Sequence, residues 1–204
     1  MQNDVLTRAI DRPLAGKRRA AAQDVRRLVD AGLVVIRRHG GLDPKVSEIV
    51  REAGLSNQAF YRHFASKDEL LLAILAEGRR ELLAFLERRM AAEPRPIDQA
   101  KRWIEGVLAQ ARNAKAASAT RPFAVNAARL ARDFPDEVAA SADALKAPLR
   151  NALAAADTRD PSRDADAIYL LAFGAMERHL VAGTRPTDAE ADHLIAFALR
   201  GAAS

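Results

Sequence analysis

Residues 46–71 read VSEIVREAGLSNQAFYRHFASKDELL and carry the signals of two short helices joined by a turn. Gly54 is expected to end a helix over residues 44–53, because glycine accepts the left-handed backbone geometry of a C-cap. Ser56 is a good N-cap for a second helix, predicted over residues 57–64. Two short helices joined by a glycine-containing turn have the outline of a helix-turn-helix.

The residues around this motif supply further helix boundaries. Asp43 and Pro44 are expected to open the first short helix, as N-cap and first helical residue. After the motif, Ser66 and Glu69 form the pattern of a capping box, which predicts a helix from Ser66 to about residue 92. Before the motif, apolar residues at steps of three and four predict a helix over residues 20–39.

The second short helix carries polar side chains suited to reading DNA. Asn57 and Gln58 lie at its N-terminal end, and amide side chains can pair bidentately with adenine in the major groove. Phe60 and Phe64 are four residues apart and should anchor the helix inward. Lys67 follows at a helix N-terminus, where a cation is unfavourable, so a phosphate partner would explain its presence. The side chains that can reach backbone phosphates are Tyr61, Arg62, His63 and Lys67.

The charge of the chain is unevenly distributed along its 204 residues. Residues 1–67 contain 13 Lys and Arg against 7 Asp and Glu, a net charge of +6, whereas residues 68–204 contain 19 against 20. A basic segment joined to a near-neutral remainder is the electrostatic pattern expected of a phosphate-binding module. Chance clustering of charges on a solvated surface is the alternative.

The remainder of the chain is rich in Ala and Leu, which favours helices over sheets. We predict an all-α fold, with a three-helix helix-turn-helix head and a larger helical body. Pro, Gly and Asp signals divide the body after residue 92 into helices over residues 97–116, 122–132, 135–156, 164–182 and 187–202, with Asp164 and Thr187 as N-caps. The predicted parts are a flexible arm (1–19), the DNA-binding head (20–66) and the body (67–204).

The composition excludes several classes of protein. There is no cysteine, which excludes disulfides and thiolate metal sites. No apolar run approaches the roughly 20 residues that span a bilayer, and the first 16 residues lack the pattern of a signal peptide. We therefore expect a cytoplasmic protein without a membrane partner. No cofactor is expected either.

The motif strongly resembles the signature of the TetR family of bacterial transcriptional regulators. The shared elements are the apolar and acidic first helix, the Ala-Gly-apolar-Ser turn around Gly54, and Tyr-Arg-His-Phe over residues 61–64. Ser-Lys-acidic-acidic-Leu-Leu follows over residues 66–71. The resemblance covers about residues 20–75, and the total length and the helical body agree with it. It implies a sequence-specific DNA-binding regulator, most often a repressor.

The resemblance also implies roles for single residues. The family's phosphate-contacting Tyr and Lys fall on Tyr61 and Lys67. The family often has Thr or Ser at the start of the first short helix, for a further phosphate contact, but this chain has Asp43-Pro44-Lys45. Lys45 is expected to replace that contact with a charge. The residues that would enter the groove are Ser56, Asn57, Gln58 and Arg62.

A homodimer is a further implication of the resemblance, with the last two long helices of each chain forming a four-helix bundle. Small and apolar residues on these helices permit close packing. Two heads on one dimer would read a palindromic operator. An unidentified small molecule in the body would release the DNA by binding the other state better. The expected interface residues are Ala172, Ala175, Met176, Leu194, Ile195 and Ala198.

Candidate residues for the effector pocket are aromatic or polar side chains on largely apolar body helices, and each could equally belong to the core or the surface. They are Trp103, Phe123, Asn126, Arg129 and His179. The histidines lack the close spacing of metal ligands, so no metal site is expected. An enzyme is a weaker alternative, because no nucleophile, carboxylate pair or cofactor motif supports it. A non-specific architectural DNA protein is another, but it would need only charge and not the amides of the second short helix.

Overall fold

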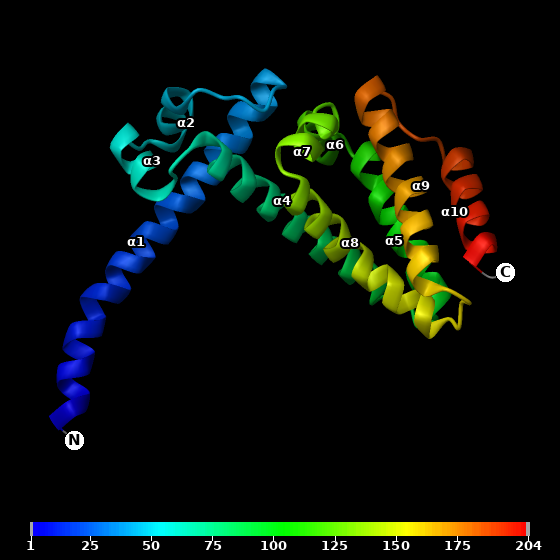
Figure 1. The fold of residues 1–204 in the computed structure, drawn as a ribbon, viewed down its shortest axis with the longest axis horizontal. Helices are drawn as coiled ribbons and strands as arrows, with labels where there is room; N and C mark the ends of the chain where they lie inside the picture. Colours follow the sequence, from blue (N-terminus) through cyan, green and yellow to red (C-terminus); the bar gives the residue numbers. More distant parts are fainter. Residues whose placement is uncertain (1, 203–204) are drawn as a thin grey trace. The chain divides into compact units, whose positions relative to one another are not determined.

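The computed structural model describes the backbone of residues 2–202 and the side chains of residues 16–202. All regular elements in this range are helices, which confirms the all-α prediction (Figure 1). The chain divides between Ile74 and Leu75 into two compact units, each with its own packing. The helices are α1 Gln2–His39, α2 Val46–Ala53, α3 Asn57–His63, α4 Lys67–Met90, α5 Pro96–Arg112, α6 Ala114–Ala124, α7 Ala127–Asp133, α8 Pro135–Ala155, α9 Pro161–Ala182 and α10 Asp188–Ala202.

The first helix is longer than its sequence pattern predicted. It ends at His39 as expected, and Gly40 follows with a φ of +71°. It begins at Gln2 instead of residue 20, so the predicted arm is helical from residue 2 onward. Ala and Arg have high helix propensity and are frequent around the two helix-disfavouring residues of this segment, Pro13 and Gly16. The flexibility of residues 1–19 stays a prediction.

One face of α1 is the centre of the N-terminal unit. Leu28, Val35 and Ile36 are buried on it, and α2 and α3 pack against the helix. The face also includes Gly32, where a Cβ atom would lie 2.8 Å from Cδ1 of Ile74. The start of α4 therefore lies very close to α1. The first residues of α4 therefore belong to the compact N-terminal unit. The boundary at residues 66/67 between a DNA-binding head and a body stays a prediction.

The structure corrects the predicted start of α2. The helix begins at Val46, two residues late, and its N-cap is Lys45, which has extended backbone and makes no side-chain capping bond. Asp43 does not cap the helix; its carboxylate accepts a hydrogen bond from Nζ of Lys67. The turn after α2 follows the prediction. Gly54 has a φ of +62°, and Oγ of Ser56 accepts a hydrogen bond from the Ala59 N–H at 3.1 Å.

Helix α5 is the central helix of the C-terminal unit and packs against α6, α8, α9 and α10 (Figure 1). Trp103 is fully buried on it, and its indole N–H donates a 3.0 Å hydrogen bond to the Leu145 carbonyl of α8. Close packing also occurs at Gly106, where a Cβ atom would lie 2.5 Å from Cδ2 of Leu86 on α4. Among the described residues, no helix is long and apolar enough to cross a membrane.

Several helix boundaries of this unit differ from the predictions because other residues cap them. Asn113 accepts hydrogen bonds from two backbone N–H groups and starts α6, so Pro122 lies inside that helix and does not open a new one. Asp160, not Asp164, caps α9 through a bond from the Arg163 N–H. Thr187 caps α10 as predicted, in a reciprocal pair with Glu190.

Two helical glycines of this unit allow a matched test of the packing. Gly106→Ala should lower the melting temperature, because overpacking against buried Leu86 costs about 1–3 kcal/mol and the gain in helix propensity is only up to about 1 kcal/mol. Gly78→Ala should raise it, because a Cβ atom there meets nothing within 4 Å. Thermal unfolding followed by circular dichroism measures both. A stabilised Gly106→Ala variant would contradict the close approach of α4 and α5.

Candidate nucleic-acid interface

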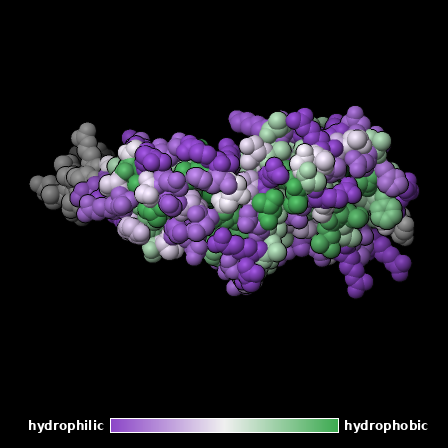
Figure 2. Space-filling view, turned by 90° about the horizontal axis from the view of Figure 1, so that it is seen from above, coloured by the Kyte–Doolittle hydropathy of each residue, from purple (hydrophilic) through white to green (hydrophobic). Residues whose placement is uncertain are grey.

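Helix α3 presents a polar face to solvent and an apolar face to the N-terminal unit. Ala59 and Phe60 are buried, and Phe60 has no exposed surface. Tyr61 is 62% exposed, with its ring edge-on to the Phe60 ring at 5.2 Å between centroids. In Figure 2 the N-terminal part, at the left beside the grey atoms, is mostly hydrophilic on the face shown. The predicted DNA-contacting residues that are exposed are Lys45, Ser56, Asn57, Gln58, Tyr61, Arg62 and Lys67.

Polar contacts from α1 hold the turn and α2 in place. Arg27 donates a 3.2 Å hydrogen bond from Nη2 to the Gly54 carbonyl, and a Cβ atom at Gly54 would lie 2.9 Å from that same nitrogen. Near the end of α1, Arg38 pairs with Glu52 of α2 at 2.9 Å. The turn of the motif is therefore fixed to α1 by side chains as well as by the apolar core.

The placement of His63 argues against the phosphate contact predicted for it. Its side chain is only 11% exposed, and Nε2 lies 3.6 Å from a carboxylate oxygen of Asp24 on α1. His63 therefore connects the end of α3 to α1 and does not share the exposed face of Tyr61. Asp24 lies 39 positions earlier in the sequence, and no local pattern signals this pairing.

Lys67 has an intramolecular partner that the sequence analysis missed. It is the first residue of α4, and its Nζ donates a hydrogen bond to Oδ1 of Asp43. Both side chains are partly exposed, 44% for Lys67 and 67% for Asp43. A carboxylate can thus offset the unfavourable position of this cation, and a phosphate is not needed to explain it. The capping box next to it is present in modified form, because Glu69 accepts from the Ala65 N–H while its own N–H donates to Ser66.

The five residues predicted for an effector pocket lie on α5, α6, α9 and at the start of or within α7, and none of them lines the cleft between α4, α5 and α8. Trp103 is fully buried in the core. His179 is also buried, and its Nδ1 lies 2.8 Å from the Thr184 hydroxyl. Asn126 donates to the Pro122 carbonyl, and Arg129 pairs with Asp133 within α7. Phe123 is half-buried on α6. Their role in ligand binding stays a prediction.

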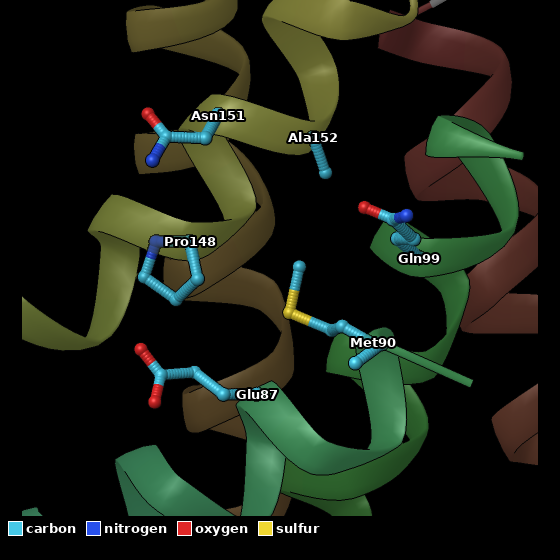
Figure 3. A pocket seen from close by; sticks show the side chains of 7 residues that line it. Glu87, Met90, Gln99, Pro148, Asn151 and Ala152 are labelled. Atoms are coloured by element: carbon cyan, nitrogen blue, oxygen red, sulfur yellow. The ribbon is translucent and has the colours of Figure 1, made fainter. Parts of the chain in front are cut away.

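The C-terminal unit has an open cleft between the end of α4, the start of α5 and the C-terminal part of α8 (Figure 3). Its volume is about 300 Å³. The sulfur of Met90 and the rings and methyl groups of α8 supply apolar surface, and a carboxylate and two amides lie around them. The lining residues are Glu87, Met90, Ala91, Gln99, Pro148, Asn151 and Ala152.

The structure corrects the choice of dimer-interface residues. Ala172, Met176, Ile195 and Ala198 are buried in the core of the single chain, and Ala175 and Leu194 pack against that core. The four buried side chains are therefore not available to a second chain, whereas Ala175 and Leu194 are partly exposed. The same two helices carry other large apolar side chains that are exposed: Leu170 at 69%, Leu171 at 39%, Val181 at 51% and Phe197 at 57%.

On α9, exposed residues lie along one line of the helix, and Leu171 is turned about 100° away from it. Leu170, Gly174 and Val181 are spaced by four and seven residues, and such spacing places residues on one helix face. A Cβ atom at Gly174 would meet nothing within 4 Å, so this face is open. Glu177 lies on the same line, and burial raises the pKa of its carboxyl.

In the described part of the chain, no group of three or more His, Asp or Glu side chains could hold a metal.

Comparison with known proteins identifies the N-terminal unit. The family profile "Bacterial regulatory proteins, tetR family" matches residues 28–74. The HTH-type transcriptional regulator BetI of Agrobacterium fabrum is 43% identical over 72 residues, which are 33% of this chain and 34% of that protein. The HTH-type transcriptional regulator Rv1816 of Mycobacterium tuberculosis is 30% identical over 108 residues, 52% and 44% of the two chains. This chain thus spans less than half the length of these relatives.

Solved structures show the same fold over nearly the whole chain. The TetR-family regulator SCO4454 from Streptomyces coelicolor superposes with a TM-score of 0.70 at 20% identity, covering 90% of this chain and 97% of that one. A TetR-like regulator from Rhodococcus sp. RHA1 does so with a TM-score of 0.63 at 24% identity, covering 87% and 94%. Residues 28–74 therefore match the helix-turn-helix segment of the TetR family of bacterial regulatory proteins, and most of the chain has the fold of the solved TetR-like regulators.

Proposed function

We propose that this protein is a sequence-specific DNA-binding transcriptional regulator that acts as a homodimeric repressor. The observation that carries the proposal is the exposed polar face of α3, with Asn57, Gln58, Tyr61 and Arg62 on a helix that Phe60 anchors in the core. A short helix with amides at its N-terminal end suits the major groove, where base edges present a readable pattern. The two relatives are named as HTH-type transcriptional regulators, which supports the same function.

Removing an amide side chain from this face of α3 tests whether the helix reads bases or only binds phosphates. We expect Gln58→Ala to weaken binding to the preferred duplex by about 1–3 kcal/mol and to leave binding to a scrambled duplex nearly unchanged. Tyr61→Phe should weaken both alike, because a phosphate contact carries no sequence information. The measurement is fluorescence anisotropy with a duplex selected from a random pool. Equal losses of Gln58→Ala on both duplexes would favour a non-specific architectural protein instead.

The homodimer is proposed to form through the exposed apolar face of α9 and α10, which we define as Leu170, Leu171, Gly174, Val181 and Phe197. This face replaces the residues chosen from the sequence, four of which (Ala172, Met176, Ile195 and Ala198) are buried in the core. Two heads related by a two-fold axis would meet two half-sites of a palindromic operator in successive major grooves. Because such an operator is chromosomal, the protein would act in the cytoplasm.

A charge on the α9–α10 face should separate the subunits. We expect Leu170→Glu combined with Phe197→Glu to shift the protein from dimer to monomer, since an unpaired carboxylate would have to be buried in the interface. Val125→Glu is the matched control, because Val125 is also exposed, at 44%, but lies outside this face. Sedimentation equilibrium gives the mass of each variant. A dimeric double variant would place the interface elsewhere.

The release of DNA by a small molecule is proposed for the C-terminal unit, with the cleft at Met90 and Pro148 as the site. Its volume of about 300 Å³ is at the lower end of ligand pockets. An effector must bind the state that does not bind DNA more tightly than the other state. Its mixed lining of apolar side chains, a carboxylate and amides suits a small molecule with an apolar body and hydrogen-bond donors.

Blocking the cleft from its rim tests this assignment. Ala91 is exposed at the cleft, so Ala91→Trp should fill the space without disturbing the core. For a compound found to lower DNA affinity, we expect Ala91→Trp to abolish that effect and to keep the wild-type affinity for DNA alone. Anisotropy titrations with and without the compound give both values. An undiminished response of the variant would place the effector at another site.

A further inference from the structure

We propose that Asp43 competes with DNA phosphate for Lys67 and so lowers the affinity of the head for every duplex, whatever its sequence. This inference rests on the proposed DNA-binding function and concerns how that same surface is tuned. The carboxylate of Asp43 accepts a hydrogen bond from the Lys67 ammonium, which is the group proposed to meet a DNA phosphate. Asp43 is thus an internal anion that can take the place of that phosphate beside the lysine.

The ion pair joins two parts of the N-terminal unit that are distant in sequence. Asp43 lies in the loop between α1 and α2, and Lys67 is the first residue of α4. Their side chains are 67% and 44% exposed, so a solvent anion can reach both partners. An exposed pair of this kind contributes little to stability, because water screens it and both side chains lose freedom. The pair can therefore open at low cost when a stronger anion arrives.

The charges around the pair make the competition direct. An ammonium group has three donors and no acceptor, and it can donate to a carboxylate oxygen or to a phosphate oxygen. Lys67 stands at the positive end of the α4 dipole, so an anion is favoured beside it in either state. In the complex, Asp43 would lie close to the polyanionic DNA backbone. It must then give up Lys67 to a phosphate or remain near that phosphate as a like charge, and both outcomes weaken binding.

The effect should be independent of sequence, because phosphate contacts position a protein without reading bases. The gain in DNA affinity should also depend on the Asp43–Lys67 pair and not merely on the net charge of the head. Asp30 provides the matched control. It lies exposed on α1 of the same unit, and it makes no hydrogen bond or ion pair with the described residues. Asp30→Asn therefore removes the same charge without freeing a lysine.

The test compares Asp43→Asn with Asp30→Asn in the full-length protein, by anisotropy on a selected duplex and a scrambled duplex across a salt series. We expect Asp43→Asn to bind both duplexes about two- to fivefold more tightly, with a steeper dependence on salt because one more phosphate is neutralised. Asp30→Asn should change neither by more than about 1.5-fold. Equal gains from the two variants would assign the effect to net charge and overturn the proposal. A gain confined to the selected duplex would overturn it as well.

A double variant shows whether Asp43 acts through Lys67. In a Lys67→Gln background, Asp43→Asn should no longer strengthen binding, because there is no cation left to release. A full gain in that background would mean that Asp43 repels DNA directly, and the competition would be refuted. Circular dichroism and thermal unfolding of each variant show that the head remains folded.

A probe that needs no operator distinguishes failure of this inference from failure of the proposed function. Inorganic tripolyphosphate offers phosphate groups without bases, and its binding can be followed by NMR at the Lys67 side chain. We expect Asp43→Asn to bind it two- to fivefold more tightly than the wild type and Asp30→Asn to match the wild type. This result without any DNA binding would refute the function but keep the competition. Identical affinities for all three proteins would refute the competition even if DNA binds.

Discussion

The position of α3 depends above all on the burial of Phe60. Its side chain has no exposed surface, while the next residue, Tyr61, is largely exposed. Replacing a buried Phe by Ala typically costs 3–5 kcal/mol, whereas an exposed ion pair such as Arg38–Glu52 contributes at most about 1 kcal/mol. The apolar anchor therefore sets which face of α3 points outward. The polar contacts from α1 refine the position of the turn, with Arg27 on the Gly54 carbonyl as the clearest example.

Much of the head could be predicted from sequence because its signals are local. Gly54 and Ser56 fix the turn through backbone geometry and a capping bond within three residues, and both were recognisable from residue type alone. The alternation of buried and exposed residues on α3 follows in the same way from helical spacing. The partners of His63 and Lys67 could not be predicted, because Asp24 and Asp43 come from other elements and meet them only in the folded head.

The C-terminal unit shows a different limit of sequence reasoning. Helices α9 and α10 are apolar on more than one face, so spacing alone could not say which face is covered by the chain itself. Ala172 and Met176 pack inward on α5 and its neighbours, while Leu170 and Val181 remain exposed. Burial in three dimensions decides between faces that look equally apolar in sequence. Spacing could likewise not show that Trp103 is fully buried in the core, because that burial depends on helices distant in sequence.

Pairing within the head also changes what its net charge means. The sequence gives residues 1–67 a net charge of +6, but among the described side chains of this segment four carboxylates lie within 4 Å of a basic side chain: Asp24, Asp43, Glu48 and Glu52. Their Arg, His and Lys partners lie on α1, α3 and α4. A formal count treats all positive charges as equally free to meet phosphates, yet counterion release depends only on those that neutralise DNA. Part of the positive charge of the folded head is therefore paired with carboxylates of the head itself. Asn57 and Gln58, which are proposed to contact bases, carry no charge, so this internal pairing can weaken attraction to DNA in general without altering the side chains proposed to read sequence.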